Sequence, residues 1–314
     1  MAQAPVQPGQ SIDDAFQSIL RADWKYTKSW LPVAYHRESI EGLHQGRIGL
    51  RRMRSALSIF RRKIPRRVLI QQGMEMKWLA DAFSPARDVD VFVEETLNDE
   101  TISGKVHPLA GEEKLHVITK KRSDIGYELV RETLDSDRFK VFKEAFPLWI
   151  ENKGWREQMK PEKLGRLDKP IEPYAAEVMN RRFNRILAAG PELYVMDDEE
   201  LHQVRIRIKK VRYASEFFGD IFDKEKMAKF SALTKAVQSQ MGTINDVAVM
   251  GGVIARLLEG EGDSDVISYI IGVTALRGGQ KHVAKEGLAE RWKQLSSLEL
   301  PWVDSPDRIG DEWD

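Results

Sequence analysis

The chain has 314 residues, of which 42% are hydrophobic and 31% charged, and these proportions fit a folded protein. Its 49 basic and 49 acidic residues give a formal net charge of zero, so a site for an anionic partner needs a local concentration of basic residues. Cysteine is absent, which excludes disulfides, thiolate catalysis and cysteine-ligated metals. Neither a signal-peptide pattern nor an apolar run of about eighteen residues occurs, so we expect a cytoplasmic protein with no membrane partner.

Apolar residues recur at spacings of three and four along most of the chain, and this periodicity predicts an all-α fold. It is clearest in the segments 11–31, 139–150 and 173–189. Proline and lysine are concentrated between Pro161 and Pro173, which indicates a linker between two halves. The expected organisation is a disordered tail at 1–10, a first helical bundle at 11–160, the linker at 161–173, a second bundle at 174–298 and a C-terminal tail at 299–314.

One unusual line of sequence occurs twice. It reads "LHQGRIGLRRMR" at 43–54 and "LHQVRIRIKKVR" at 201–212. A single shift of 158 positions carries His44 onto His202 and, without a gap, Asp88 onto Asp246. Two matching blocks in one register predict an internal duplication, with about four helices in each half.

On a helix, the first copy of this line separates an apolar face from a cationic one. Relative to His44, the side chains of Arg47, Arg51 and Arg54 project at about −60°, −20° and −80°, whereas Arg52 projects at about 80°. The apolar side chains project about 160–240° away and would face a bundle core; they are Leu50, Met53, Leu57 and Phe60. The second copy has the same two faces, with Ile208, Val211 and Phe218 on its apolar side.

Nine basic residues lie between Arg47 and Arg67 without one acidic residue among them. Like charges stacked on a helix repel each other, so the row needs an anion beside it. Carboxylates of neighbouring helices are one source, with Asp88, Asp90 and Asp246 as candidates, and an external polyanion is the other. The repetition of the row favours the external polyanion, because a two-fold site gives a reason to keep the row in both copies.

The two lines, together with "SPARDVDVF" and "GTINDVAVM" later in each half, resemble the four signature motifs of CHAD domains. The resemblance covers residues 11–298 and implies two four-helix bundles related by a pseudo-two-fold axis, with basic residues lining a groove or pore between them. It also implies binding of inorganic polyphosphate in the cytoplasm, on polyphosphate granules. The candidate ligands that it implies are His44, Arg47, Arg51, Arg54, His202, Arg205, Lys209 and Arg212, with Arg52, Lys77, Lys210 and Lys235 in second rank.

The function predicted from the sequence is non-catalytic binding of polyphosphate, by a protein that is not an enzyme and needs no cofactor and no metal. Two alternatives remain open: a metal-dependent enzyme that processes polyphosphate or triphosphate, and a purely structural interaction protein. Nucleic acid is a less favoured partner, because neither twelve-residue line contains an aromatic residue on which bases could stack. The oligomeric state is not predicted.

Two details of the signature lines carry further expectations. Gly46 and Gly49 weaken the first helix, so we expect them to permit close approach of a neighbouring helix or of the ligand. Lys209 and Lys210 replace two arginines of the first copy, and lysine cannot fork onto phosphate, so the halves are expected to contribute unequally. Finally, we expect tighter binding below about pH 6.5, where His44 and His202 become cationic.

Overall fold

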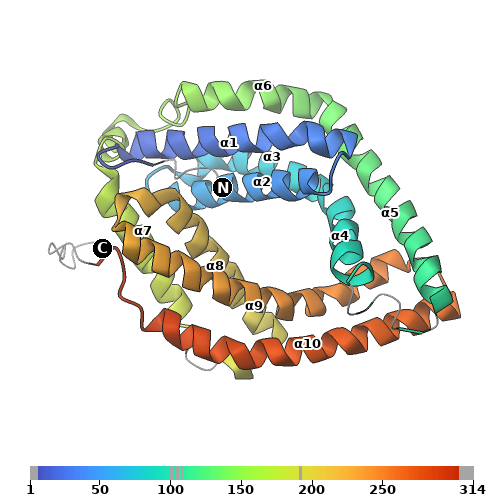
Figure 1. The fold of residues 1–314 in the computed structure, drawn as a ribbon. Helices are drawn as coiled ribbons and strands as arrows, with labels where there is room; N and C mark the ends of the chain where they lie inside the picture. Colours follow the sequence, from blue (N-terminus) through green and yellow to red (C-terminus); the bar gives the residue numbers. More distant parts are fainter. Residues whose placement is uncertain (1–5, 100–101, 103–105, 108, 191–192, 304–314) are drawn as a thin grey trace. The chain divides into compact units, whose positions relative to one another are not determined.

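The computed structural model describes residues 6–99, 102, 106, 107, 109–190 and 193–303 (Figure 1). These residues form helices and loops with one isolated β-bridge, between Ser11 and Pro170, and no strand, so the predicted all-α class is confirmed. The α-helices are α1 (Ile12–His36), α2 (Glu41–Phe60), α3 (Arg66–Ala82), α4 (Ser84–Phe92), α5 (Leu109–Asp135), α6 (Asp137–Glu151), α7 (Ile171–Leu187), α8 (Asp198–Phe218), α9 (Lys224–Leu257) and α10 (Ser264–Ser296). Shorter helical turns are η1 (Val93–Leu97), η2 (Pro161–Arg166), η3 (Leu193–Val195) and η4 (Gly219–Ile221).

The chain divides into two compact units, each assembled from separate segments. The α2 unit consists of Leu20–Lys160 and Thr243–Ala284, and the α8 unit consists of the described parts of Met1–Ile19, Pro161–Gly242 and Lys285–Asp314. The helices α1, α9 and α10 each contribute residues to both units. The two bundles with a pseudo-two-fold axis, and a boundary at 161–173, stay predictions.

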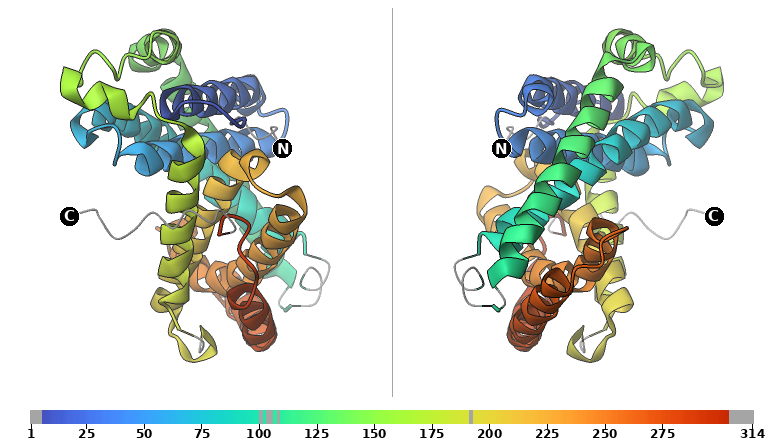
Figure 2. Two further views of the ribbon diagram at one scale, coloured as in Figure 1. Left: turned by 90° about the vertical axis from the view of Figure 1, so that its left-hand side faces the viewer. Right: turned by 90° about the vertical axis from the view of Figure 1, so that its right-hand side faces the viewer.

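In the α2 unit, helix α2 packs on α3 and helix α4 packs on α5. All four residues of the predicted apolar face of α2 are buried, which follows from the free energy gained when apolar surface leaves water. Helix α6 lies alongside α1 (Figures 1 and 2), and Trp24 of α1 makes edge-on contacts with the rings of Phe142 and Phe146. A second apolar cluster joins α4 and α5 to the parts of α9 and α10 in this unit; it includes Val89, Phe92, Leu115, Met250, Val253, Val266, Tyr269 and Val273.

Close contact between helices accounts for one of the two glycines in the signature line. A methyl group at Gly49 would overlap the Thr27 hydroxyl oxygen of α1, so the absence of a side chain lets α1 and α2 approach each other. A methyl group at Gly46 would lie 3.3 Å from the Phe83 ring. Of the two explanations expected for these glycines, the contacts of both positions favour a neighbouring segment of the protein.

In the α8 unit, helix α7 packs on helix α8, and the predicted apolar residues Ile208, Val211 and Phe218 are buried. The Asp197 side chain and the Glu200 side chain form a capping box at the start of α8, which satisfies two free amide groups of the helix.

Parts of the expected tails and linker pack on the α8 unit. Val6 and Trp302 are buried, and the Trp302 ring meets the Phe230 ring at 4.9 Å between centroids. The Ile171 amide, at the start of α7, donates a hydrogen bond to the Gln10 carbonyl over 2.9 Å. The described residues at 6–10 and 299–303 are therefore folded parts of this unit. No helix among the described residues has the length and apolar character that crossing a membrane requires.

Candidate anion site on the signature helices

Four basic side chains of the α2 unit lie within electrostatic range of one another. They are His44, Arg47 and Arg51 on α2 and Arg87 on α4. Burial lowers the pKa of His44, and the positive charges of Arg87, Arg51 and Arg47 lower that pKa further, against the opposing effect of Glu41. The expected protonation of His44 near pH 6.5 is therefore displaced to lower pH in the free protein.

Arg47 is anchored at the junction between α3 and α4. Its guanidinium donates a hydrogen bond of 2.7 Å to the Ala80 carbonyl and another to the Ser84 hydroxyl. Carbonyls in the last turn of a helix lack partners within the helix and attract cations, which explains this placement at the end of α3. Burial is the largest cause that lowers the pKa of Arg47, and the charge of Arg51 adds to it.

Arg51 and Arg87 are half-buried and form no ion pair within the described part of the chain, although the charge of Arg87 acts on the buried Asp90 from a longer range. Arg54, one turn beyond Arg51, is exposed and also makes no ion pair with any described residue. These cations therefore leave a local excess of positive charge beside Arg47, and bringing them together is unfavourable until an anion binds.

Arg52 faces the interior and is removed from the set of candidate ligands. Its Nε atom lies 2.8 Å from Oδ1 of Asp23 in α1, and the two side chains are 8% and 1% exposed. A buried ion pair is closed to an external anion, because separating it would leave a buried charge without a partner. The helical projection of Arg52, away from the stripe of His44, is consistent with this different role.

Lys77 remains a candidate ligand, although it already has a carboxylate partner. Its side chain is exposed, and it forms an ion pair with Asp81 one turn later on α3. Because exposed pairs of this kind contribute little, a phosphate can compete with Asp81 for Lys77.

The α8 unit has basic residues in the same register, with two lysines in place of arginines and with more contacts to the protein. His202, Arg205 and Lys209 are half-buried, and each interacts with other residues of the chain. Arg212 lies 3.4 Å from the carboxylate of Glu216 on the next turn. Lys210 and Lys235 are exposed.

The acidic residues of the first motif have partners other than the arginines of α2. Asp88 accepts a 2.8 Å ion pair from Arg256 of α9, although its charge also acts to raise the pKa of Arg47. Asp88, a candidate for neutralising the basic row, therefore forms its ion pair with Arg256 and acts on Arg47 only from a longer range. Asp246 falls in α9, and its side chain lies outside the described residues.

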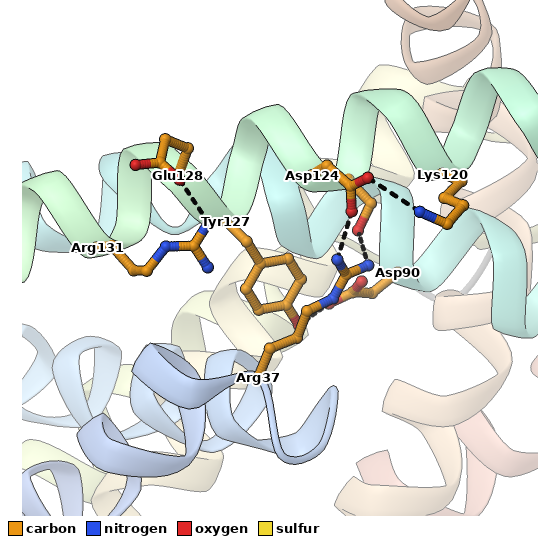
Figure 3. Close-up of polar contacts among 8 residues, drawn as sticks. Arg37, Asp90, Lys120, Asp124, Tyr127, Glu128 and Arg131 are labelled. Carbon is orange, nitrogen blue, oxygen red and sulfur yellow. Dashed lines mark hydrogen bonds and ion pairs between the residues drawn. The ribbon is translucent and has the colours of Figure 1, made fainter.

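Asp90 is the buried member of this motif. The Tyr127 hydroxyl of α5 donates a 2.9 Å hydrogen bond to it, and the Arg37 guanidinium lies 4.4 Å from the centre of the Tyr127 ring (Figure 3). Arg37, just after α1, also donates to Ser123 at 2.8 Å and to Asp124 at 2.6 Å. Burial raises the pKa of Asp90, and the contacts as a whole fix α4 against α5 and the end of α1.

Sequence reasoning missed Arg87. The residue stands inside "SPARDVDVF", but that motif was read for its acidic residues. The sequence shows only that this residue is basic, because its nearness to the row of α2 depends on how α4 packs on α2. Within the described residues, no group of three or more histidine, aspartate and glutamate side chains is arranged to hold a metal ion.

The fold and the site define a class: an all-helical domain whose signature helix presents a row of half-buried cations. The family model described as CHAD domain matches residues 18–255, which is more than half of the chain. The protein therefore belongs to the CHAD domain family. A search of curated proteins finds no match.

Two solved structures share the fold. A crystal structure of the CHAD domain from the plant Ricinus communis is 22% identical, covers 96% of this chain and 97% of its own, and superposes with a TM-score of 0.79. PptA from Streptomyces chartreusis is 17% identical, covers 90% of this chain and 100% of its own, and gives a TM-score of 0.63. These similarities show the helical fold.

Proposed function

We propose that the protein binds inorganic polyphosphate without altering it, through the basic rows of α2 and α8. One observation carries the proposal: Arg51 and Arg87 are held beside His44 and Arg47 although neither arginine forms an ion pair with a described carboxylate. The association of CHAD domains with polyphosphate and triphosphate supports the choice of ligand.

The chemistry of polyphosphate suits a row of this kind. It is a linear chain of phosphates, so its charges repeat along a line, as do the cations along one face of α2. Basic side chains displace the counterions that condense on such a polyanion, and this release drives binding at low salt. Arg51 and Arg87 can also donate two hydrogen bonds each to one phosphate, because guanidinium groups are planar forks.

Two carboxylates of the first motif, Asp88 and Asp90, support binding over catalysis. Asp88 is engaged by Arg256, and Asp90 is buried under the Tyr127 hydroxyl. Acid–base chemistry on a phosphate chain needs a carboxyl group that is free to act on the ligand, and both of these are engaged by other side chains. The enzymatic alternative keeps a clear test, since an enzyme changes the length of the chain.

The decisive experiment is a binding titration of the purified protein with polyphosphate, made with the wild type and with Arg51→Gln/Arg87→Gln. We expect the double variant to bind at least tenfold more weakly at low salt and to remain folded. The matched control is Lys121→Gln/Lys143→Gln, which removes two exposed lysines of the same unit from α5 and α6. Equal affinity of the wild type and of Arg51→Gln/Arg87→Gln would refute this site and favour a structural role.

Two further measurements separate the alternatives. Incubation with polyphosphate and Mg²⁺ or Mn²⁺ should leave the chain length unchanged on a gel, and shortened or extended chains would establish an enzyme. RNA of equal charge should displace polyphosphate poorly, because the rows offer no stacking rings. We also propose residence on cytoplasmic polyphosphate granules, which a fluorescent fusion imaged with and without polyphosphate synthesis would test.

A further inference from the structure

A second basic surface lies at the turn between α2 and α3. We call it the basic corner; it comprises residues 61–67, "RRKIPRR", with five basic residues and no acidic one. It belongs to neither signature line, and nothing in the proposed site uses it. The corner consists of Arg61, Arg62, Lys63, Arg66 and Arg67 around the buried Ile64.

The four arginines of the corner are exposed, and three of them form no ion pair within the described part of the chain. Arg61 and Arg66 form no ion pair with a described residue, and Arg67 donates a 3.3 Å hydrogen bond to the main-chain carbonyl of Gln158. The exposed Glu157 precedes Gln158 and pairs with no described residue. Arg62 and Lys63 make other contacts within the chain, so the argument rests on the remaining three arginines.

The corner also contains an unfavourable helix start. Helix α3 begins with Arg66 and Arg67, has no acidic residue in its first turn, and lacks a side-chain cap on its amide groups. The positive end of the helix dipole favours anions, so two arginines there repel it as well as each other. By contrast, an acidic residue stands in the first turn of α1, α2, α5, α6, α7, α8, α9 and α10.

The second half of the chain provides an internal comparison. The same shift of 158 positions carries the corner onto residues 219–225, "GDIFDKE", where Asp220 replaces Arg62 and Glu225 replaces Arg67. That turn joins α8 to α9 as the corner joins α2 to α3. Because the second turn forms with acidic residues, a positive charge is not a requirement of this connection.

The corner continues the cationic face of α2. Arg61 projects at about −100° from His44, next to Arg54 at about −80°, so both lie on one side of the helix. With a rise of 1.5 Å per residue, Arg61 lies about 15 Å beyond Arg51 along the axis and about 21 Å beyond Arg47. A short phosphate chain cannot reach both ends of this line, and a long chain can.

We infer that the basic corner is a second contact surface for the same linear polyanion, occupied only by chains long enough to extend from the signature row. The inference rests on the proposed function. It assigns the arginines at 61, 66 and 67 to binding, and it makes affinity depend on chain length. An anion at the corner also neutralises the unfavourable start of α3.

The test compares tripolyphosphate with long-chain polyphosphate at several salt concentrations. The variant is Arg61→Gln/Arg66→Gln/Arg67→Gln. The matched control is Lys25→Gln/Lys121→Gln/Lys143→Gln, which removes three exposed lysines of the same unit that form no ion pair with a described residue. We expect the corner variant to bind the long chain about tenfold more weakly, with its logarithmic salt dependence reduced by about two to three. Its affinity for tripolyphosphate should equal that of the wild type, and the control should change neither.

The outcomes separate the two claims. If the corner variant binds the long chain with the affinity and salt dependence of the wild type, the role of the corner is overturned and the proposed function still stands. An equal loss for tripolyphosphate and for the long chain would also overturn it, because the effect would then be one of general charge. A wild-type protein that retains neither ligand would overturn the proposed function and this inference with it.

Discussion

Replacing Arg52 by methionine should destabilise the protein without removing its anion site. Methionine fills similar space but leaves the Asp23 carboxylate, 1% exposed, without its partner at 2.8 Å. Removing one member of a buried pair costs about 3–5 kcal/mol. With an unfolding entropy of about 2.1 cal/mol/K per residue over 314 residues, this loss corresponds to a decrease in Tm of about 5–8 °C.

Thermal unfolding followed by circular dichroism measures this decrease, and polyphosphate titration well below the Tm measures binding. We expect Arg52→Met to unfold earlier and to bind as the wild type does. The double variant Asp23→Leu/Arg52→Met should recover most of the loss, because an apolar pair replaces the ion pair. If Arg52→Met lowers the free energy of unfolding by less than about 1 kcal/mol, the pair of Arg52 and Asp23 contributes no more than an exposed ion pair does. Weakened binding by folded Arg52→Met would return Arg52 to the site.

Three other predictions concern α2. Arg51→Gln should keep the fold and reduce the logarithmic salt dependence of polyphosphate binding by about 0.7–0.9, measured by titration from low to physiological salt; an unchanged slope would exclude a phosphate contact. Burial and Arg87 lower the pKa of His44, and a bound anion raises it, so binding takes up a proton. Affinity should therefore rise as the pH falls toward the lowered pKa of His44 in the free protein. In His44→Gln that rise should be smaller at constant salt, and an identical pH profile would show that His44 does not titrate on binding. Gly49→Ala places a methyl group against the Thr27 hydroxyl and should lower stability by about 1–3 kcal/mol in thermal unfolding, whereas a neutral result would mean that α1 moves freely away.

Periodicity predicted the fold class and the two faces of the signature helices because it is local. A helix places residues three and four apart on one side whatever surrounds it, so the burial of Leu50 and Met53 followed from spacing alone. The same geometry placed Arg51 on the cationic face and Arg52 away from it. Spacing does not predict which residue of another helix a side chain contacts.

The partner of Arg52 could not be predicted, because Asp23 lies on another helix, 29 residues earlier in the chain. The sequence shows that a charged side chain is present on one face of a helix. Whether that side chain contacts a carboxylate or water depends on how the helices pack. Arg87 was missed for the same reason, since its nearness to His44 arises from the way α4 meets α2. The segmented units are also non-local, because their contacts join residues as far apart as Asp88 and Arg256.

The unneutralised cations along α2 and its corner should govern how the protein behaves on a column. Its pI of about 7.1 and zero net charge predict weak retention on a cation exchanger at neutral pH. A cation-exchange resin or a heparin bead binds a local patch of positive charge even when the net charge of the protein is zero. Elution should therefore come later than the pI suggests. Nucleic acid from a cell extract should bind such a patch weakly, through charge alone, so a high-salt wash before any titration should remove it.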